Sequence, residues 1–139
     1  MNANELVQQA IDHAPDAILI ADAAGTITYW NSGAERMFGY PAAEAVGRSL
    51  DLIIPATLRS RHWEGYYRVM ASGETKYRTG LLSSPGICRD GRRISLEFSM
   101  VLLTNETGET IGCASIMRDV TERWQKEKEL KQRLLAAGG

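Results

Sequence analysis

The sequence lacks the features that mark several large classes of protein. Its two cysteines, Cys88 and Cys113, lie far apart, follow no CxxC spacing and have no histidine nearby, so they indicate neither a zinc site nor a disulfide framework. No apolar run approaches the roughly 20 residues that a membrane span needs. Glu5 stands where a signal peptide would carry a basic residue. We therefore expect a cytoplasmic protein, in a reducing compartment and without a membrane span.

A surplus of charge of either sign is also lacking. The chain has 16 lysines and arginines against 17 aspartates and glutamates, which gives a net charge of -1. Nucleic-acid binding needs a basic face that neutralises phosphates, so we expect no nucleic-acid partner. Neither a GxSxG nor an HExxH element is present, and no candidate nucleophile has a base at fixed spacing, so we expect no enzyme. The length of 139 residues suits one domain with its own core.

The pattern of apolar residues and turn residues predicts an α+β fold with an antiparallel sheet. Strands are expected in two groups, with helices between them and at both ends, and no βαβ alternation is present. The expected strands are 17–21, 26–30, 77–88 as an irregular edge strand, 94–103 and 110–117. A short helix is expected between Asn31, a favourable N-cap, and Gly39, a favourable stop. A longer helix is expected over 57–71.

The two ends of the chain differ in character from its middle. We divide the chain into an N-terminal amphipathic helix (1–13), a central domain (14–121) and a C-terminal polar helix (122–139). The apolar residues of the C-terminal helix are too sparse for a heptad pattern and favour a helix that leaves the domain and pairs with a second copy, although both terminal helices could instead dock on the domain's own sheet. We therefore expect a homodimer through Trp124, Leu130 and Leu134, joined by the N-terminal helix through Leu6 and Ile11.

Several motifs together resemble the PAS domain family, the small sensory modules of signal-transduction proteins. The matching segments, which cover nearly the whole chain, are APDAILIAD, GTITYWNSGAERMFGYPAAEAVGRSL, the GE at 73–74, the RDG at 89–91 and the RDVTER at 118–123. The resemblance implies a five-stranded antiparallel sheet with helices on one face enclosing a pocket. It also implies a sensor in two-component or transcriptional regulation, which passes changes in the pocket through the C-terminal helix to an output domain.

The resemblance also bears on the ligand. The flavin branch of the family carries an Asn-Cys-Arg-Phe motif where this chain has GRSLDLIIP, so a flavin adduct is not expected. The stretch RSRHWEGYYRVMASGE is similar to the oxygen-sensing haem branch, which implies His62 as an axial ligand of haem iron. Arg59, Arg61 or Arg68 are then candidates to pair with the haem propionates. The candidate cofactor-binding residues are His62, Arg68, Tyr66, Leu82 and Met100.

Other interpretations of the pocket remain open. One is an unidentified small ligand, with Trp30, Trp63, Tyr66, Tyr67 and Tyr77 either lining the pocket or filling the core. Another is a dimerisation or interaction domain that binds no ligand. That interpretation predicts a tightly packed core of Ile18, Ile20, Ile53, Leu96, Phe98, Met100 and Ile116.

Overall fold

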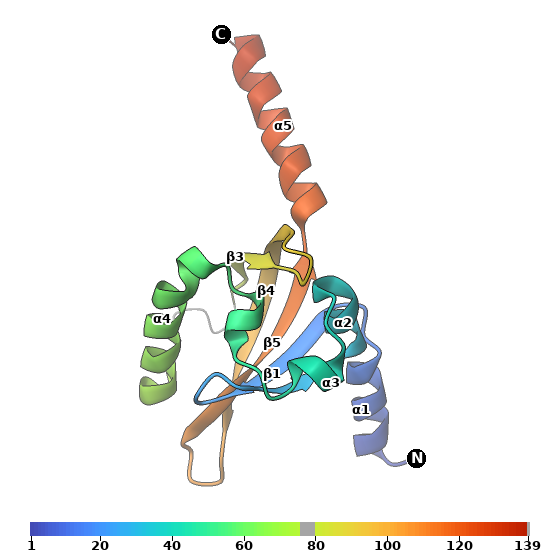
Figure 1. Cartoon of the computed structure of the whole chain (residues 1–139), viewed down its shortest axis with the longest axis vertical. Helices are drawn as coiled ribbons and strands as arrows, with labels where there is room; N and C mark the ends of the chain where they lie inside the picture. Colours follow the sequence, from blue (N-terminus) through green and yellow to red (C-terminus); the bar gives the residue numbers. More distant parts are fainter. Residues whose placement is uncertain (76–79, 139) are drawn as a thin grey trace.

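The chain forms one five-stranded antiparallel sheet, as the sequence predicts. The computed structural model describes residues 1–75 and 80–138, and Figure 1 shows the sheet with helices beside and in front of it. The strand order is β2-β1-β5-β4-β3, and every neighbouring pair is antiparallel. The strands are β1 (Ala17–Asp22), β2 (Ile27–Trp30), β3 (Leu82–Ile87), β4 (Arg93–Thr104) and β5 (Thr110–Asp119). The expected edge strand over 77–88 is β3, although residues 77–79 lie outside the described part.

The helices are short except for one beside the sheet and one at each end of the chain. The α-helices are α1 (Ala3–Asp12), α2 (Ser32–Phe38), α3 (Ala42–Ala45), α4 (Arg59–Ser72) and α5 (Thr121–Gly138). Two 3-10 helices, η1 (Leu50–Ile53) and η2 (Ala56–Leu58), connect α3 to α4. The helix expected over 57–71 is therefore the end of η2 followed by α4. Gly73 ends α4 with a φ of 69°, a left-handed conformation that glycine adopts without strain.

The core lies on the side of the sheet that faces α2 and α3. Leu19 is 1% exposed, whereas Ile18 and Ile20 are only half-buried and Ile116, which pairs with Ile18, is 40% exposed. The expectation of Ile18, Ile20 and Ile116 in a tight core is therefore wrong. Residues 17–21 are apolar at every position, so alternation along the strand cannot show which face points inward. The remaining expected core residues lie on the inner side: Ile53, Leu96, Phe98 and Met100.

Asn31 joins three parts of the domain through its buried side chain. Its Oδ1 accepts hydrogen bonds from the backbone N–H of Ala34 at 2.9 Å and of Ile18 at 2.8 Å. Its Nδ2 donates to the backbone oxygens of Ile11 at 2.9 Å and Asp16 at 3.1 Å. The first of these bonds caps α2 and the second holds the start of β1. The bond to Ile11 holds the end of α1, and the bond to Asp16 holds the connection between α1 and β1. The predicted N-cap is confirmed, and it has a wider structural role than a cap alone.

Helix α5 leaves the domain and extends away from it (Figure 1). Its base is fastened to β4: the backbone N–H of Val120 donates to Ser95 O at 2.8 Å, and Ser95 N–H donates to the Thr121 hydroxyl at 2.8 Å. Arg123 in the first turn forms an ion pair with Glu97 of β4 at 2.5 Å. Asp119, the last residue of β5, also accepts from Thr121 N–H at 2.9 Å, so contacts with β4 and with the end of β5 hold the base of α5.

The two terminal helices leave their apolar residues uncovered. No residue of α1 or of the described part of α5 is buried. Leu6 is 52% exposed on α1, and Trp124, Leu130 and Leu134 are 49%, 58% and 66% exposed on α5. Figure 1 shows the two helices at different ends of the molecule. Of the helices in the described ranges, none combines the length and the apolar character that crossing a bilayer requires.

Candidate functional site

A cavity of about 810 Å³ lies between α4 and strands β3 and β4. Its wall is made by Arg61, His62, Gly65, Tyr66, Arg68, Val69, Ser72, Glu74, Thr75, Leu82 and Met100. The structure thus brings the five candidate residues, His62, Arg68, Tyr66, Leu82 and Met100, to one cavity. They come from three elements, since three lie on α4, Leu82 on β3 and Met100 on β4.

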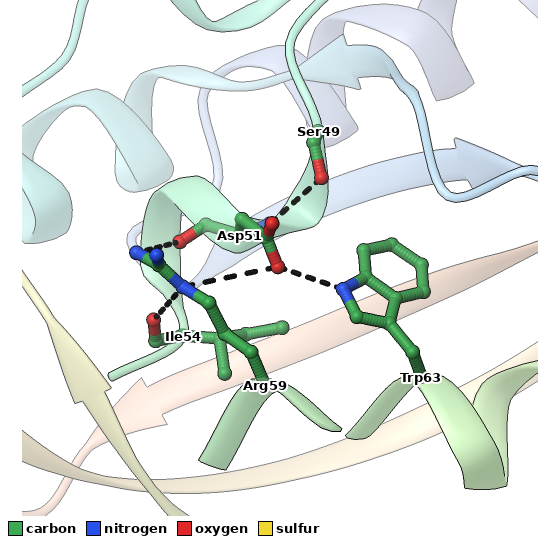
Figure 2. A network of polar contacts seen from close by, with 5 residues as sticks. All are labelled: Ser49, Asp51, Ile54, Arg59 and Trp63. Carbon is green, nitrogen blue, oxygen red and sulfur yellow. Dashed lines mark hydrogen bonds and ion pairs between the residues drawn. The ribbon is translucent and has the colours of Figure 1, made fainter. Parts of the chain in front are cut away.

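Helix α4 is held in place by a polar network at its N-terminal end, which Figure 2 shows. The Trp63 indole Nε1 donates to the Asp51 carboxylate at 2.7 Å. The Arg59 guanidinium donates to the backbone oxygens of Ile54 at 3.1 Å and Asp51 at 3.2 Å, and its Nε lies 3.8 Å from the Asp51 carboxylate. The Ser49 hydroxyl accepts from Asp51 N–H at 3.1 Å. Through these contacts the first two turns of α4 are fixed to η1.

The network corrects one expectation and refines another. Arg59 was a candidate to pair with haem propionates, but its guanidinium is engaged with Asp51 and Ile54 and does not line the cavity. The sequence also predicts that Trp63 points away from His62 on the helix. Trp63 does lie outside the cavity wall, yet the two rings are in edge-to-face contact with centroids 4.7 Å apart.

The remaining aromatic candidates contribute one residue to the cavity. Trp30 is buried in the core, Tyr67 is 54% exposed, and neither lines the cavity. Tyr77 lies outside the described residues. Only Tyr66, among the aromatic candidates that the structure describes, is part of the wall.

Tyr66 anchors the middle of α4 to the sheet. Its side chain is 7% exposed, and its hydroxyl donates to the backbone oxygen of Asp22, at the end of β1, at 2.5 Å. Burial of the phenol raises the pKa of Tyr66 well above its ordinary value, because the anion would lose its hydration. The hydroxyl is therefore protonated at all physiological pH values and acts as a donor to the strand.

His62 belongs to a cluster of three aromatic rings. Its imidazole stacks on Tyr66 with centroids 5.6 Å apart and meets Trp63 edge-to-face, and the rings of Trp63 and Tyr66 also contact each other with centroids 5.5 Å apart. The Nδ1 atom of His62 is buried and has no hydrogen-bond partner among the described residues. Burial lowers the pKa of His62 below its ordinary value of 6.5, and the Asp51 carboxylate opposes that change in part. The structure therefore favours a neutral imidazole in the cavity wall.

The side of the cavity opposite α4 is apolar. It is formed by Leu82 and Met100, on neighbouring strands, and both are partly buried. The free cysteines Cys88 and Cys113 are buried elsewhere and are not part of the wall. Burial also raises the pKa of the Cys113 thiol, which disfavours the reactive thiolate. Among the described residues there is no group of three His, Cys, Asp or Glu side chains that would hold a metal ion.

Sequence reasoning missed several residues of the wall, most notably Gly65. It stands in the middle of α4, where glycine is about 1 kcal/mol less favourable than alanine. In the part of the chain that the structure describes, a Cβ added there would meet no heavy atom within 4 Å. In the sequence, a glycine at the centre of the longest helix within the domain was the feature that could have indicated Gly65 as a residue of the site.

Together, these features define a small α+β domain with a cavity between one helix and the sheet. The family model described as the PAS fold matches residues 11–125, most of the chain. The chain therefore belongs to the PAS family, and the resemblance noted in the sequence is confirmed.

Curated relatives are sensor and signalling proteins that are much longer than this chain. The sensor protein FixL of Bradyrhizobium diazoefficiens is 32% identical over 126 residues, which cover 85% of this chain and 23% of FixL. The signal transduction histidine-protein kinase AtoS of Escherichia coli is 30% identical over 131 residues, which cover 93% of this chain and 20% of AtoS. The chain thus spans about a fifth of each, and it is a PAS domain of the type found in such sensors.

A solved structure shows the same fold. The PAS domain of a protein from Colwellia psychrerythraea superposes with a TM-score of 0.76 at 21% sequence identity. The match covers 87% of this chain and 99% of that one. At this identity the comparison supports the fold, and the ligand has to be argued from the cavity itself.

Proposed function

We propose that residues 14–121 form a non-enzymatic sensory domain that binds a small ligand in the cavity beside α4. The observation that carries this proposal is the convergence of the five candidate residues on one cavity of about 810 Å³. That volume lies in the range of roughly 300–1,000 Å³ that small-molecule sites occupy. The wall combines apolar side chains with a few polar ones, as such sites require.

We propose that a structural change caused by ligand binding passes from the cavity to an output domain along β4. Met100 of β4 lines the cavity, and Ser95 and Glu97 of the same strand hold the base of α5. A ligand that moves β4 at Met100 would act on the contacts of Thr121 and Arg123. Because the relatives are sensors and a histidine kinase that extend well beyond the matched segment, we infer an output domain of that kind beyond α5.

Filling the cavity is a direct test of ligand binding. A ligand that binds the native state raises its melting temperature by mass action. We expect a screen of small molecules to yield compounds that raise Tm by several degrees, an effect lost in Met100→Trp. Val101→Trp is the matched control, since Val101 is the next residue along β4 and is 53% exposed. If no compound raises Tm, the chain is the ligand-free interaction domain instead.

Haem is the second candidate, and it is favoured by one specific observation. His62 lines the cavity, and burial lowers its pKa and so keeps the ring neutral, as metal ligation requires. The apolar side chains of Leu82 and Met100 suit a porphyrin face, and Arg61 and Arg68 are available for its propionates. When bound, haem iron would supply gas binding or a redox change.

Absorption spectroscopy tests the haem candidate. Adding haem to the purified chain is expected to give a Soret band whose position and intensity change in His62→Ala. His13→Ala is the control, because it removes the other histidine of the chain, which lies at the end of α1 and outside the cavity. A missing Soret band, or one that is the same in His62→Ala and the wild type, would remove the haem candidate while leaving other ligands open.

We also propose that the chain forms a homodimer through α5. Leu130 and Leu134 lie one turn apart on the same face of α5, and Trp124 lies nearer its base. All three are about half exposed or more. Leu6 on α1 is exposed in the same way, and Ile11 lies near the end of that helix. Self-association would cover these apolar side chains.

A further inference from the structure

One wall of the cavity carries two arginines on either side of a glycine. Arg61, Gly65 and Arg68 follow one another at spacings of four and three residues, so they lie within about 60° of one another on one face of α4. All three line the cavity. His62, Tyr66 and Val69 form the adjacent stripe of the same helix, which also lines it. The helix therefore presents a basic stripe beside a stripe of less polar side chains.

The glycine leaves a gap between the two arginines. A Cβ built on Gly65 would have no heavy atom of the described residues within 4 Å, so no packing against them explains the choice of glycine there. Its φ lies in the ordinary helical range, because it is not among the glycines with positive φ. Glycine in a helix interior is unfavourable, and neither conformation nor packing offsets this cost at Gly65. A group bound over the helix backbone at this point would use the gap.

The two arginines are available to such a group. Arg61 has neither an ion pair nor a side-chain hydrogen bond among the described residues. Arg68 pairs with Glu64 at 3.2 Å, but the two side chains are 69% and 73% exposed. Such an exposed ion pair contributes little to stability, so Arg68 can readily leave Glu64 for another anion. Among the described residues of the wall, Glu74 is the acidic one. With Arg61 and Arg68 at +2 and Glu74 at -1, these described residues together carry a charge of +1.

We infer that the cavity takes an apolar molecule bearing a carboxylate, with the carboxylate over Gly65 between Arg61 and Arg68 and the apolar body against Leu82 and Met100. The inference rests on the proposed function, since it names the class of ligand for that cavity. A carboxylate suits the site because arginine donates to it through paired, charge-assisted hydrogen bonds. Two classes of molecule combine an apolar body with a carboxylate: straight-chain fatty acids and tetrapyrroles with propionates.

The experiment compares ligands with and without the carboxylate. Dissociation constants of the full chain are measured for dodecanoate and dodecanol, and for protoporphyrin IX and its dimethyl ester. The carboxylate form of at least one pair is expected to bind about tenfold more tightly, and the pair that shows this preference identifies the source. Arg61→Gln and Arg68→Gln are each expected to reduce the preference severalfold. Arg48→Gln, an exposed arginine outside the cavity, is expected to retain it.

Gly65→Ala separates a ligand-binding role from a structural one. Alanine is the better helix former, so this variant is expected to raise Tm of the free protein by about 2–4 °C. At the same time it is expected to weaken binding of the carboxylate several-fold, because the methyl group occupies the gap. Unchanged carboxylate affinity in Gly65→Ala, or equal affinity for acid and neutral forms in the wild type, would overturn the inference. Failure of all four compounds to bind would instead count against the proposed ligand-binding function.

Discussion

The ring of Trp63 lies directly against Gly25, the glycine of the turn between β1 and β2. A Cβ added to Gly25 would stand 2.1 Å from two atoms of that ring. The indole is thereby fixed on one side by the turn and on the other by Asp51, which accepts its N–H at 2.7 Å. Because Trp63 also touches His62, the turn helps to set the position of a residue in the cavity wall.

Gly25→Ala is therefore expected to cost more stability than the same change in another turn. Gly25 and Gly108 both have a φ of 85°, but a Cβ on Gly108 would meet nothing within 4 Å. Gly108→Ala should lose about 1 kcal/mol of unfolding free energy from the left-handed conformation alone. Gly25→Ala should lose about 2–4 kcal/mol, because Trp63 must also move. Urea denaturation of both variants checks this, and equal losses would contradict it.

Replacing Asn31 tests its role at the junction of α1, β1 and α2. Asn31→Ala leaves the backbone N–H groups of Ile18 and Ala34 without their acceptor, so a loss of about 3 kcal/mol is expected. Asn2→Ala, which removes the exposed N-cap of α1, should lose no more than about 1 kcal/mol. Hydrogen exchange should also show faster exchange at the end of α1 in Asn31→Ala. Comparable losses in the two variants would show that Asn31 acts as an ordinary cap.

Protonation of His62 is expected to make stability depend on pH. Burial lowers the pKa of His62 in the folded state, whereas the unfolded chain has the ordinary value of 6.5. Below that pH the unfolded state binds more protons, so this contribution to stability is complete above about pH 6.5 and is lost as pH falls through the lowered folded-state pKa. We expect the unfolding free energy to fall between about pH 7 and pH 5 less steeply in His62→Gln than in the wild type.

The matched control for the pH experiment is His13→Gln. It removes the other histidine without touching the cavity wall. Urea unfolding at several pH values is measured for the wild type and both variants. A pH dependence that is the same in His62→Gln and the wild type would show that His62 is readily protonated in the folded state.

Removal of α5 beyond its first residues tests the dimer. Sedimentation equilibrium is expected to show a dimer for the intact chain and a weaker one, or a monomer, for a chain ending at Arg123. Leu130→Glu with Leu134→Glu should have the same effect, because charges would replace the apolar side chains that the dimer covers. Gln125→Glu with Gln132→Glu adds the same charge to α5 and serves as the control. A monomer in every case, the intact chain included, would refute the dimer.

The fold was predictable wherever local chemistry decides structure. Asn31 and Gly39 cap and end α2 by their own hydrogen bonding and backbone conformation, so the residue types alone indicate the helix. In β4, alternation of apolar residues correctly marked the inner face. In β1 the run over 17–21 is apolar throughout. Its inner face is decided by strand pairing and by packing against the helices, and the residue types alone do not show these.

The candidate site was predictable where regular elements set the spacing. His62, Tyr66 and Arg68 share one side of a helix, and Leu82 and Met100 lie on strands that face it. Arg59 was misjudged because its partners, Asp51 and the Ile54 carbonyl, belong to a 3-10 segment with no periodic pattern to place it. The gap at Gly65 exists because no heavy atom of the described residues lies near the position of a Cβ there. The sequence alone does not show which atoms come close together in the fold.

The attachment of α4 has a consequence for how such a domain can change over time. Three side chains, those of Arg59, Trp63 and Tyr66, fasten the helix to η1 and β1. Of these three only Tyr66 lines the cavity, and most of the other wall positions on α4 make no comparable bond to the rest of the described domain. Mutation at those positions can alter chemical preference at little cost to folding, so recognition and architecture can evolve separately. The same division makes α4 a natural segment in which to redesign specificity.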